Sequence, residues 1–509
     1  MILSKQNVQG ASGAAGINAP AASLFSLPEK VLQFGTGVLL RGLNDYFIDK
    51  ANKQNLFNGR IVVVKSTDTG GTDAFATQDG LYTLLIKGID DGQKVDEAII
   101  NASISRVVSA KTEWNAILKC AESADMQVII SNTTEVGISL LEDDKVDAQP
   151  PVSFPGKLLA VLLHRYKTFN GSAESGMVII PTELIPDNGT KLKGIVNELA
   201  KRNNLDEAFI QWLNTANDFC NSLVDRIVPG KLSAEEHKAT EAKLGYQDEL
   251  MIMSECYRLW AIQSSSARTK EILSFAAADE GVVIVDNIDK YRELKLRLLN
   301  GSHTFSSGLA CVAGFKVVKE AMADKVFEDF ITTLMMEEIA PAIISNTITL
   351  DDAKQFAGKV LDRYRNPYIE HQWISICMQY TSKLKMRTVP IILNYFKKNG
   401  FVPHHIALGF AAYILFMKSK QNEKGQYVGL LNGKEYVIQD DFAANLHDKW
   451  SNNNEGSITH FVLKDETLWG TDLSQLTGFT NAVSYYLQTL THKGFETAIK
   501  TIQSNKVNA

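Results

Sequence analysis

Cysteine is scarce in this chain of 509 residues, which carries five thiols and no CxxC pair. Cysteine pairs at that spacing are the local signature of zinc clusters and dithiol redox sites, so we expect neither. An odd, sparse cysteine count in a chain of this size is typical of a reducing compartment. We therefore expect a cytoplasmic protein.

Long apolar runs and a strong charge of one sign are also missing. The longest strongly apolar stretch, Ile406–Met417, is shorter than the roughly 20 residues that span a bilayer. It predicts a buried helix instead. The formal net charge is −6, from 52 basic and 58 acidic residues, with no long Lys/Arg run. This composition argues against nucleic acid or an anionic membrane as a partner and leaves a small molecule.

Several catalytic signatures are absent from the sequence. It contains no HExxH pair, no Gly-x-Ser-x-Gly elbow and no GxxxxGK[ST] loop. The nine histidines are scattered, and the adjacent pair His404 and His405 cannot turn both rings toward one ion from a regular element. We therefore expect no metal cofactor.

The hydrophobic pattern divides the chain into two domains. Residues 28–289 alternate short β-branched runs with helical patterns, as expected for a parallel sheet buried on both faces. Residues 290–509 read mostly as helices. The predicted fold class is α/β: a Rossmann-like NAD-binding domain followed by a mainly α-helical domain, with residues 1–27 as a flexible Gly/Ala-rich arm. The expected strands of the first domain are Lys30–Phe34, Arg60–Lys65, Gln127–Ser131, Met177–Ile180, Asp225–Val228 and Val282–Asp286.

A glycine pair follows the first expected strand, in Phe34-Gly35-Thr36-Gly37. Glycines at the end of a strand let the backbone turn tightly and approach a pyrophosphate, to which the next helix offers free N–H groups. We assign Gly35, Gly37 and Arg41 to cofactor binding. Leu40 stands where the usual fingerprint has its third glycine, so a plain tight turn is the alternative interpretation.

Polar residues follow two other expected strands. Asp68 comes just after the second strand, where an acidic side chain can accept from the ribose hydroxyls and favour NAD over NADP. Lys65 nearby would instead tolerate a phosphate, and a loop-capping role for Asp68 is the alternative. Asn132 and Thr133 follow a third strand, at the edge where parallel sheets bind ligands. We include both in the cofactor site.

The run from Lys295 to His303 carries the candidate catalytic residues. Lys295, Asn300 and His303 form the pattern K-x4-N-x2-H. Asn300 and His303 share a face of a regular helix, whereas Lys295 does not, so a distortion near Gly301 or a long reach is needed to unite them. A lysine can transfer protons, and an amide can donate to a developing oxyanion. The alternatives are a solvated lysine and a buried core histidine.

This pattern resembles the signature of the long-chain mannitol dehydrogenase family of polyol and uronate dehydrogenases. Further segments that resemble the family are spread in order over most of the chain: Asp79–Tyr82, Ser153–Leu158, Asn221–Ile227 and Asn366–Ile369. The resemblance implies a metal-free, NAD-dependent dehydrogenase. It further implies that Lys295 is the acid/base, that Asn300 and Asn221 polarise the substrate oxygen, and that His303 holds the substrate.

Within the family the chain is most similar to the uronate-reducing members. That similarity implies reversible reduction of D-tagaturonate to D-altronate in hexuronate breakdown. Fructuronate reduction and polyol oxidation are the alternatives, and a non-catalytic NAD-binding protein is a remote one. Polyol-oxidising relatives carry an acidic residue where this chain has His371. A cation there would suit a substrate carboxylate, for which Arg365 and Lys383 are further candidates.

Overall fold

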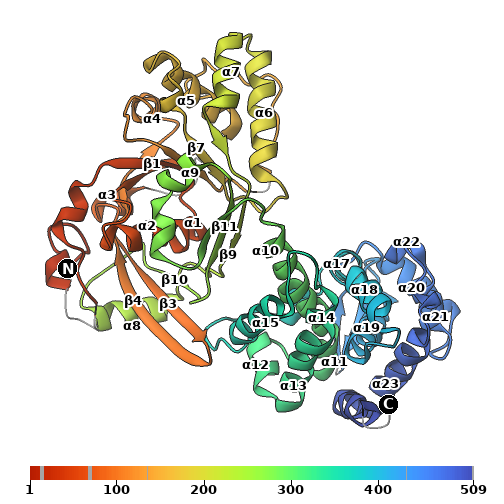
Figure 1. The fold of residues 1–509 in the computed structure, drawn as a ribbon. Coiled ribbons are helices and arrows are strands. Elements are labelled where there is room, and N and C mark those ends of the chain that lie inside the picture. Colours follow the sequence, from red (N-terminus) through yellow and green to blue (C-terminus); the bar gives the residue numbers. More distant parts are fainter. Residues whose placement is uncertain (12–16, 67–71, 135, 432, 507–509) are drawn as a thin grey trace. The chain divides into compact units, whose positions relative to one another are not determined.

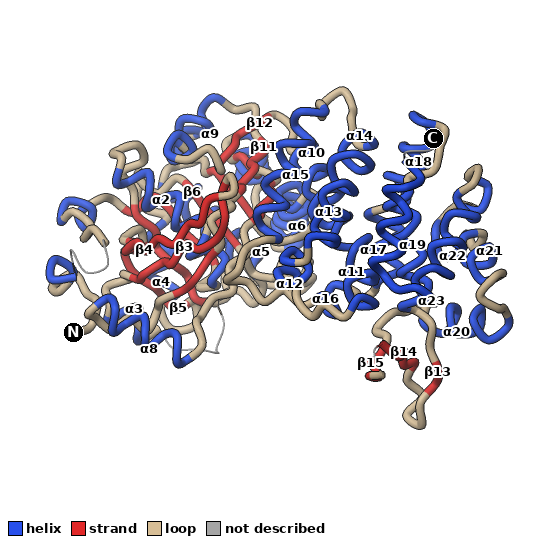
Figure 2. The backbone as a smooth tube through the Cα atoms, turned by 90° about the horizontal axis from the view of Figure 1, so that it is seen from below, coloured by secondary structure: helices blue, strands red, loops and turns tan. Residues whose placement is uncertain are grey.

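The computed structural model describes residues 1–11, 17–66, 72–134, 136–431 and 433–506 (Figure 1). They form two compact units. Unit 1 comprises Met1–Gly88 and Lys94–Ile288, and unit 2 comprises Ile89–Gln93 and Asp289–Ala509. Strands are concentrated in unit 1 and helices in unit 2, as the colouring of Figure 2 shows.

Unit 1 is built on a six-stranded sheet of order β5-β2-β1-β6-β7-β8. Every neighbouring pair in it is parallel. Successive residues of each strand point to opposite faces, so Val31 and Leu32 of β1 belong to different hydrophobic cores. Burial on both faces explains the continuous apolar runs, and the predicted parallel α/β fold is confirmed. The strands are β1 (Glu29–Phe34), β2 (Arg60–Lys65), β5 (Ile104–Ser109), β6 (Val128–Ser131), β7 (Val178–Pro181) and β8 (Asp218–Phe219).

Helices cover both faces of this sheet. Their ends follow ordinary capping chemistry: Ser153 caps α5 by accepting from the N–H of Gly156, and Ser233 forms a capping box with Glu236 at the start of α8. The helices of unit 1 are α1 (Val38–Gly42), α2 (Asn44–Lys53), α3 (Asp73–Thr77), α4 (Trp114–Cys120), α5 (Phe154–Thr168), α6 (Asn188–Arg202), α7 (Glu207–Thr215), α8 (Ala234–Leu244) and α9 (Ala267–Ile272).

Two smaller sheets complete unit 1. One joins β3 (Tyr82–Asp90), β4 (Gln93–Asn101) and β10 (Ile252–Ser254); the other joins β9 (Ser222–Asp225), β11 (Leu259–Gln263) and β12 (Val282–Val285). The expected strand at Asp225–Val228 is wrong in position. It ends at Asp225, because β9 pairs antiparallel with β11 from Ser222 to Asp225 and not with the main sheet.

The N-terminal segment is packed where it is described. Leu3, Val8 and Ile17 are almost completely buried in a core cluster with Leu81 and Tyr246. The described part of residues 1–27 is therefore packed against the rest of unit 1, in contrast to the flexible arm expected from composition. Composition does not reveal this, because the few apolar side chains of the segment are buried by residues far away in the sequence.

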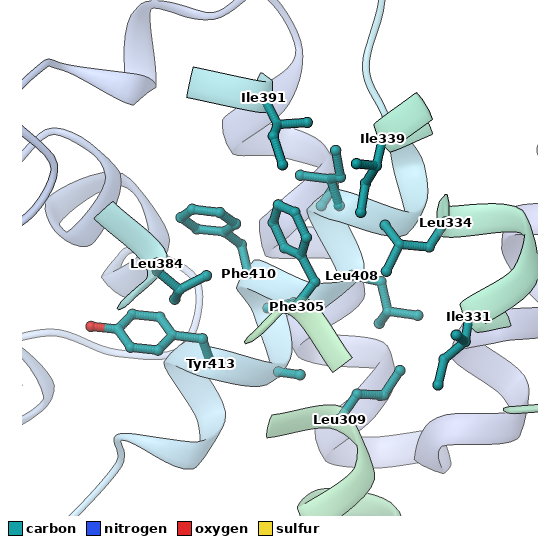
Figure 3. Close-up of a cluster of buried hydrophobic side chains, with 14 of the residues drawn as sticks. Phe305, Leu309, Ile331, Leu334, Ile339, Leu384, Ile391, Leu408, Phe410 and Tyr413 are labelled. Atoms are coloured by element: carbon teal, nitrogen blue, oxygen red, sulfur yellow. The ribbon is translucent and has the colours of Figure 1, made fainter. Parts of the chain in front are cut away.

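Unit 2 is mainly helical, as predicted, around one large core in which Phe305 and Leu309 of α11 lie beside Leu408 and Phe410 of α19 (Figure 3). Its helices are α10 (Asp289–Leu294), α11 (Ser302–Ala313), α12 (Val318–Ala323), α13 (Lys325–Thr333), α14 (Ala340–Ala342), α15 (Leu350–Tyr364), α16 (Trp373–Ile376), α17 (Tyr380–Arg387), α18 (Val389–Asn399), α19 (His404–Phe416), α20 (Ala443–Asn452), α21 (Ile458–Leu463), α22 (Glu466–Trp469) and α23 (Phe479–Lys506). Its strands are β13 (Lys420–Gln421), β14 (Tyr427–Leu431) and β15 (Lys434–Val437).

The apolar stretch Ile406–Met417 forms most of α19, and this helix is buried almost all round. That outcome confirms the prediction of a buried helix. Within the described residues, no helix is long and apolar enough to cross a membrane.

Candidate active site

The predicted catalytic run begins with a π-helix. Residues Lys295–Gly301 form the π-helix η6, which lies between α10 and α11. In an α-helix, residues five apart lie about 140° around the axis from each other. The i→i+5 hydrogen bonds of a π-helix instead place such residues one turn apart on the same side. Lys295 and Asn300 are therefore brought to one side by the distorted turn.

His303 lies in the first turn of α11 and is only 8% exposed. Its ring stacks on Tyr364, with centroids 4.1 Å apart, and meets the edge of His371 at 5.0 Å. Burial, followed by the nearby His371, Arg363 and Arg387, holds the pKa of His303 well below its usual value. Its Nε2 is buried and has no hydrogen-bond partner among the described residues. A neutral imidazole with an unsatisfied nitrogen is suited to a polar substrate group.

Tyr364, at the end of α15, anchors the π-helix. Its hydroxyl donates to the carbonyl of Leu299 at 3.0 Å and lies 2.8 Å from the hydroxyl of Ser302. One residue thus supports both the irregular backbone and the ring of His303.

Basic side chains gather around His303. The pKa of His371 is lowered by burial and then by Arg363 and Lys383, and that of Lys383 by burial and then by Arg387. The ammonium group of Lys383 donates to the carbonyl of Ile376 at 2.9 Å. The predicted carboxylate partners His371 and Lys383 therefore lie near each other, but the lowered pKa keeps His371 uncharged near neutral pH, so the positive charge that attracts an anion comes from Lys383 and the neighbouring arginines.

Arg365, the third predicted carboxylate partner, is committed elsewhere. Its guanidinium contacts Glu328 at 2.8 Å and Asp362 at 3.4 Å. These two acids neutralise it, so Arg365 serves the fold, and the prediction that it meets the substrate is not supported.

Asn221 belongs to unit 1, in the connection between β8 and β9. Its Oδ1 accepts from the N–H of Thr190 at 2.9 Å, and its carbonyl accepts from Gln263. The residue borders a cavity of about 470 Å³ that is also lined by Asp218 and Arg268. The backbone contact orients the side-chain amide at the edge of this open space.

The glycine turn after β1 has the geometry of a phosphate-binding turn. Gly35 has φ +134°, and a Cβ there would lie 2.9 Å from the carbonyl oxygen of Asn132 and from Leu40 Cδ1. Only glycine fits this approach. A Cβ on Gly37 would meet nothing within 4 Å, which leaves room for a ligand at the start of α1. Leu40 replaces the third glycine because its side chain fills the core against Gly35.

The residues after β6 are held by those after β7. Asn132 Nδ2 donates to the carbonyl and hydroxyl oxygens of Thr182, both at 3.1 Å. The backbone N–H and the hydroxyl of Thr133 both donate to Glu183 Oε1 at 2.9 Å. Because β1, β6 and β7 are parallel neighbours, these residues and the glycine turn share the carboxyl edge of the sheet. The edge fits a dinucleotide.

Arg41 and Asp68 are the two remaining predicted cofactor residues. Arg41 is turned into the core: its Nη1 donates to the carbonyl of Leu250 at 2.6 Å, and its guanidinium lies over the rings of Phe75 and Tyr82. The guanidinium of Arg41 is thus engaged by the protein itself, and its role in cofactor binding stays a prediction. Asp68 lies outside the described residues.

Sequence reasoning missed Tyr364, Arg363 and Arg387, as well as the supporting acid Glu183. Tyr364 and Arg363 lie just before the Asn366–Ile369 segment, which was the one signal available for them. Arg387 had no such signal. Among the described residues, no group of three or more His, Cys, Asp and Glu side chains is placed to hold a metal ion.

Comparisons with known proteins cover nearly the whole chain. The Mannitol dehydrogenase Rossmann domain matches residues 29–273, and the Mannitol dehydrogenase C-terminal domain matches residues 287–491. The altronate oxidoreductase of Bacillus subtilis is 38% identical over 93% of this chain and 95% of its own length. Those of Halalkalibacterium halodurans and Escherichia coli K12 are each 37% identical, over 94% and 93% of this chain and 93% and 97% of their own lengths.

Two solved structures share the fold. Mannitol 2-dehydrogenase of Pseudomonas fluorescens, in a ternary complex with NAD and D-mannitol, superposes with a TM-score of 0.65 at 24% identity, covering 99% of this chain and 100% of that one. A substrate-free D-sorbitol dehydrogenase superposes with a TM-score of 0.75 at 18% identity, covering 98% and 100%. The Rossmann-like and helical architecture predicted for the two halves is thereby confirmed.

Proposed function

The chain belongs to the mannitol dehydrogenase family, and we propose that it is an altronate oxidoreductase acting in hexuronate breakdown. It is an NAD-dependent oxidoreductase. The proposed reaction is D-tagaturonate + NADH + H⁺ ⇌ D-altronate + NAD⁺. The relatives that carry this name are similar to the chain over more than nine-tenths of its length. The observation that carries the choice of an acidic sugar is the presence of the cations Lys383 and Arg387 near His303, with Arg387 in contact with Thr304 in the turn that follows His303.

Each proposed catalytic side chain has a distinct task. NADH supplies the hydride that reduces the keto carbon. Lys295, as an ammonium group, gives its proton to the carbonyl oxygen. Asn300 and Asn221 donate hydrogen bonds to that oxygen as charge develops on it. His303, neutral because of its low pKa, holds a substrate hydroxyl with its unsatisfied nitrogen.

The domains divide this work. We assign NAD binding to residues 28–289. Within this domain we assign Gly35, Gly37, Asn132 and Thr133 to the side of the cofactor that carries the phosphates and the nicotinamide, and Asp68 to the ribose. The acid–base lysine belongs to residues 290–509. A cytoplasmic location is part of the proposal, and it is supported by the five cysteines, which are buried and form no disulfide.

A comparison of three substrates with the purified protein tests the function. NADH oxidation is measured with D-tagaturonate, D-fructuronate and D-fructose. We expect the highest kcat/KM with tagaturonate and the lowest with fructose. A preference for fructuronate would make the chain a fructuronate reductase, and a preference for fructose would make it a polyol dehydrogenase. NADH binding without turnover of any ketose would indicate a non-catalytic binding protein.

A further inference from the structure

Arg387, the last residue of α17, contacts the catalytic turn directly. Its Nη1 donates to the hydroxyl of Thr304 at 3.2 Å, and that hydroxyl donates to the carbonyl of Asn300 at 2.7 Å. The backbone carbonyl of Arg387 accepts from Arg297 at 2.9 Å, which holds the end of α17 against η6. The guanidinium is thereby placed next to the turn that carries Asn300 and His303.

The guanidinium of Arg387 does not use all of its hydrogen-bond donors. Arg387 Nε is buried without a hydrogen-bond partner, and no carboxylate among the described residues forms an ion pair with Arg387. Two other arginines of unit 2 have such a partner: Arg297 pairs with Glu293 at 2.9 Å, and Arg365 pairs with Glu328 at 2.8 Å. A partly buried cation without a counter-ion costs free energy unless an anion binds.

Further positive charge surrounds it. Lys383 lies one turn before Arg387 on the same face of α17. Burial and then Arg387 lower the pKa of Lys383, and Arg387 also contributes to the low pKa of His303. Positive groups that lie close enough to affect one another's pKa form a site that favours an anionic ligand.

We propose that Arg387 binds the carboxylate of the uronate substrate and is the residue that makes the enzyme select acidic over neutral ketoses. The inference rests on the proposed function. A guanidinium presents parallel N–H donors that match a carboxylate, and Thr304 holds the fork in place. Lys383 adds charge to the same site without replacing that geometry.

The test compares Arg387→Met with the matched control Arg365→Met, because both substitutions remove one arginine from unit 2. Kinetic constants are measured for D-tagaturonate and D-fructose. Loss of a charged hydrogen-bonded contact should lower kcat/KM for tagaturonate about 10- to 100-fold, mainly through KM, and kcat/KM for fructose should fall much less. Arg387→Lys should recover part of the loss. Arg365→Met should keep the wild-type ratio of the two substrates, and thermal melting of each variant reports whether it is folded.

Equal losses of kcat/KM on tagaturonate and fructose in Arg387→Met would overturn the proposal, as would wild-type values of kcat/KM on both substrates. A failure of the proposed function is seen separately, in the wild-type protein. If wild type reduces another hexuronate and not tagaturonate, the same variants are assayed with that uronate, and a selective loss still supports Arg387. If wild type prefers fructose, both proposals fall together.

Discussion

The imidazole of His303 lies flat against the ring of Tyr364, with 4.1 Å between their centroids and 23° between their planes. The hydroxyl of the same tyrosine donates to the carbonyl of Leu299, inside the π-helix that carries Lys295 and Asn300. Tyr364 therefore couples the position of the histidine to the shape of the helix that presents the other two residues.

Two substitutions of Tyr364 separate these contributions. Tyr364→Phe keeps the stacked ring and removes the hydroxyl, so we predict a loss of about 0.5–1.5 kcal/mol in the free energy of unfolding and a fall of less than 10-fold in kcat. Tyr364→Leu also removes the ring beneath His303 and should reduce kcat further. Urea denaturation and steady-state kinetics provide the two readouts. Equal kcat values for both variants would show that stacking does not position His303.

Replacement of Lys295 tests the acid/base role. Lys295→Met removes the proton donor and retains much of the side-chain volume, so we predict a fall in kcat of about 100- to 10,000-fold. The affinity for NADH, measured by fluorescence titration, should stay near that of wild type, since the cofactor turn lies in unit 1. Near-normal turnover in this variant would exclude Lys295 as the proton donor.

His303 should make stability depend on pH below its ordinary pKa. Its folded-state pKa is depressed by burial, whereas in the unfolded chain the ring takes up a proton near pH 6.5. The unfolded state thus binds more protons, and the free energy of unfolding falls as the pH drops from 6.5 toward the folded-state pKa. His303→Gln should have a shallower fall over this range. Parallel wild-type and variant curves, from chemical denaturation at several pH values, would contradict this.

Asp45 should have the opposite pH dependence. This carboxyl is completely buried at the start of α2, and burial raises its pKa to about 8 against the opposing effect of Arg41. Because the folded state keeps the proton longer than the unfolded state, stability is lost as the pH rises from about 4 to 8. Asp45→Asn should be less sensitive over this interval and more stable than wild type at pH 8–9. A less stable variant at pH 9 would show that the ionised carboxylate is favoured in the fold.

Glu183 is predicted to support the cofactor edge. It accepts two hydrogen bonds from Thr133, and Glu183→Gln turns one acceptor oxygen into a donor. We expect the Kd for NADH to rise by about 10-fold, from loss of an interaction worth about 1.4 kcal/mol. Glu174→Gln is the matched control, since the side-chain carboxylate of Glu174 accepts from the hydroxyl of Ser172 at the surface of unit 1. An equal effect of both substitutions would contradict the role of Glu183.

Local pattern in the sequence was enough for four strands of the central sheet, β1, β2, β6 and β7, but not for its edge strands β5 and β8. The runs Ile61–Val64 in β2 and Val128–Ile130 in β6 are apolar at every position, and Gln33 is the one polar residue within Val31–Phe34 of β1. Such runs are typical of strands covered on both faces, so these strands and their parallel class follow from the chain alone. The hairpin of β3 and β4 was missed, although its Asp91-Gly92 turn has positive φ at both residues and such a pair is a hairpin signal. The catalytic run was found through its resemblance to a family.

Tertiary structure decided which side chains are free to act. Arg41 and Arg365 looked available in the sequence, but the first packs into the core and the second is neutralised by Glu328. Arg387 carried no sequence signal, because what distinguishes it is a contact with Thr304 from 83 residues away. The sequence by itself determined the four inner strands of the sheet and the helical second half, since these depend on neighbouring residues, and it supplied the candidate catalytic run through its resemblance to a family. Only the fold decided the π-helical presentation of Lys295 and Asn300 and the pairing of each charge, since both depend on residues far apart in the chain.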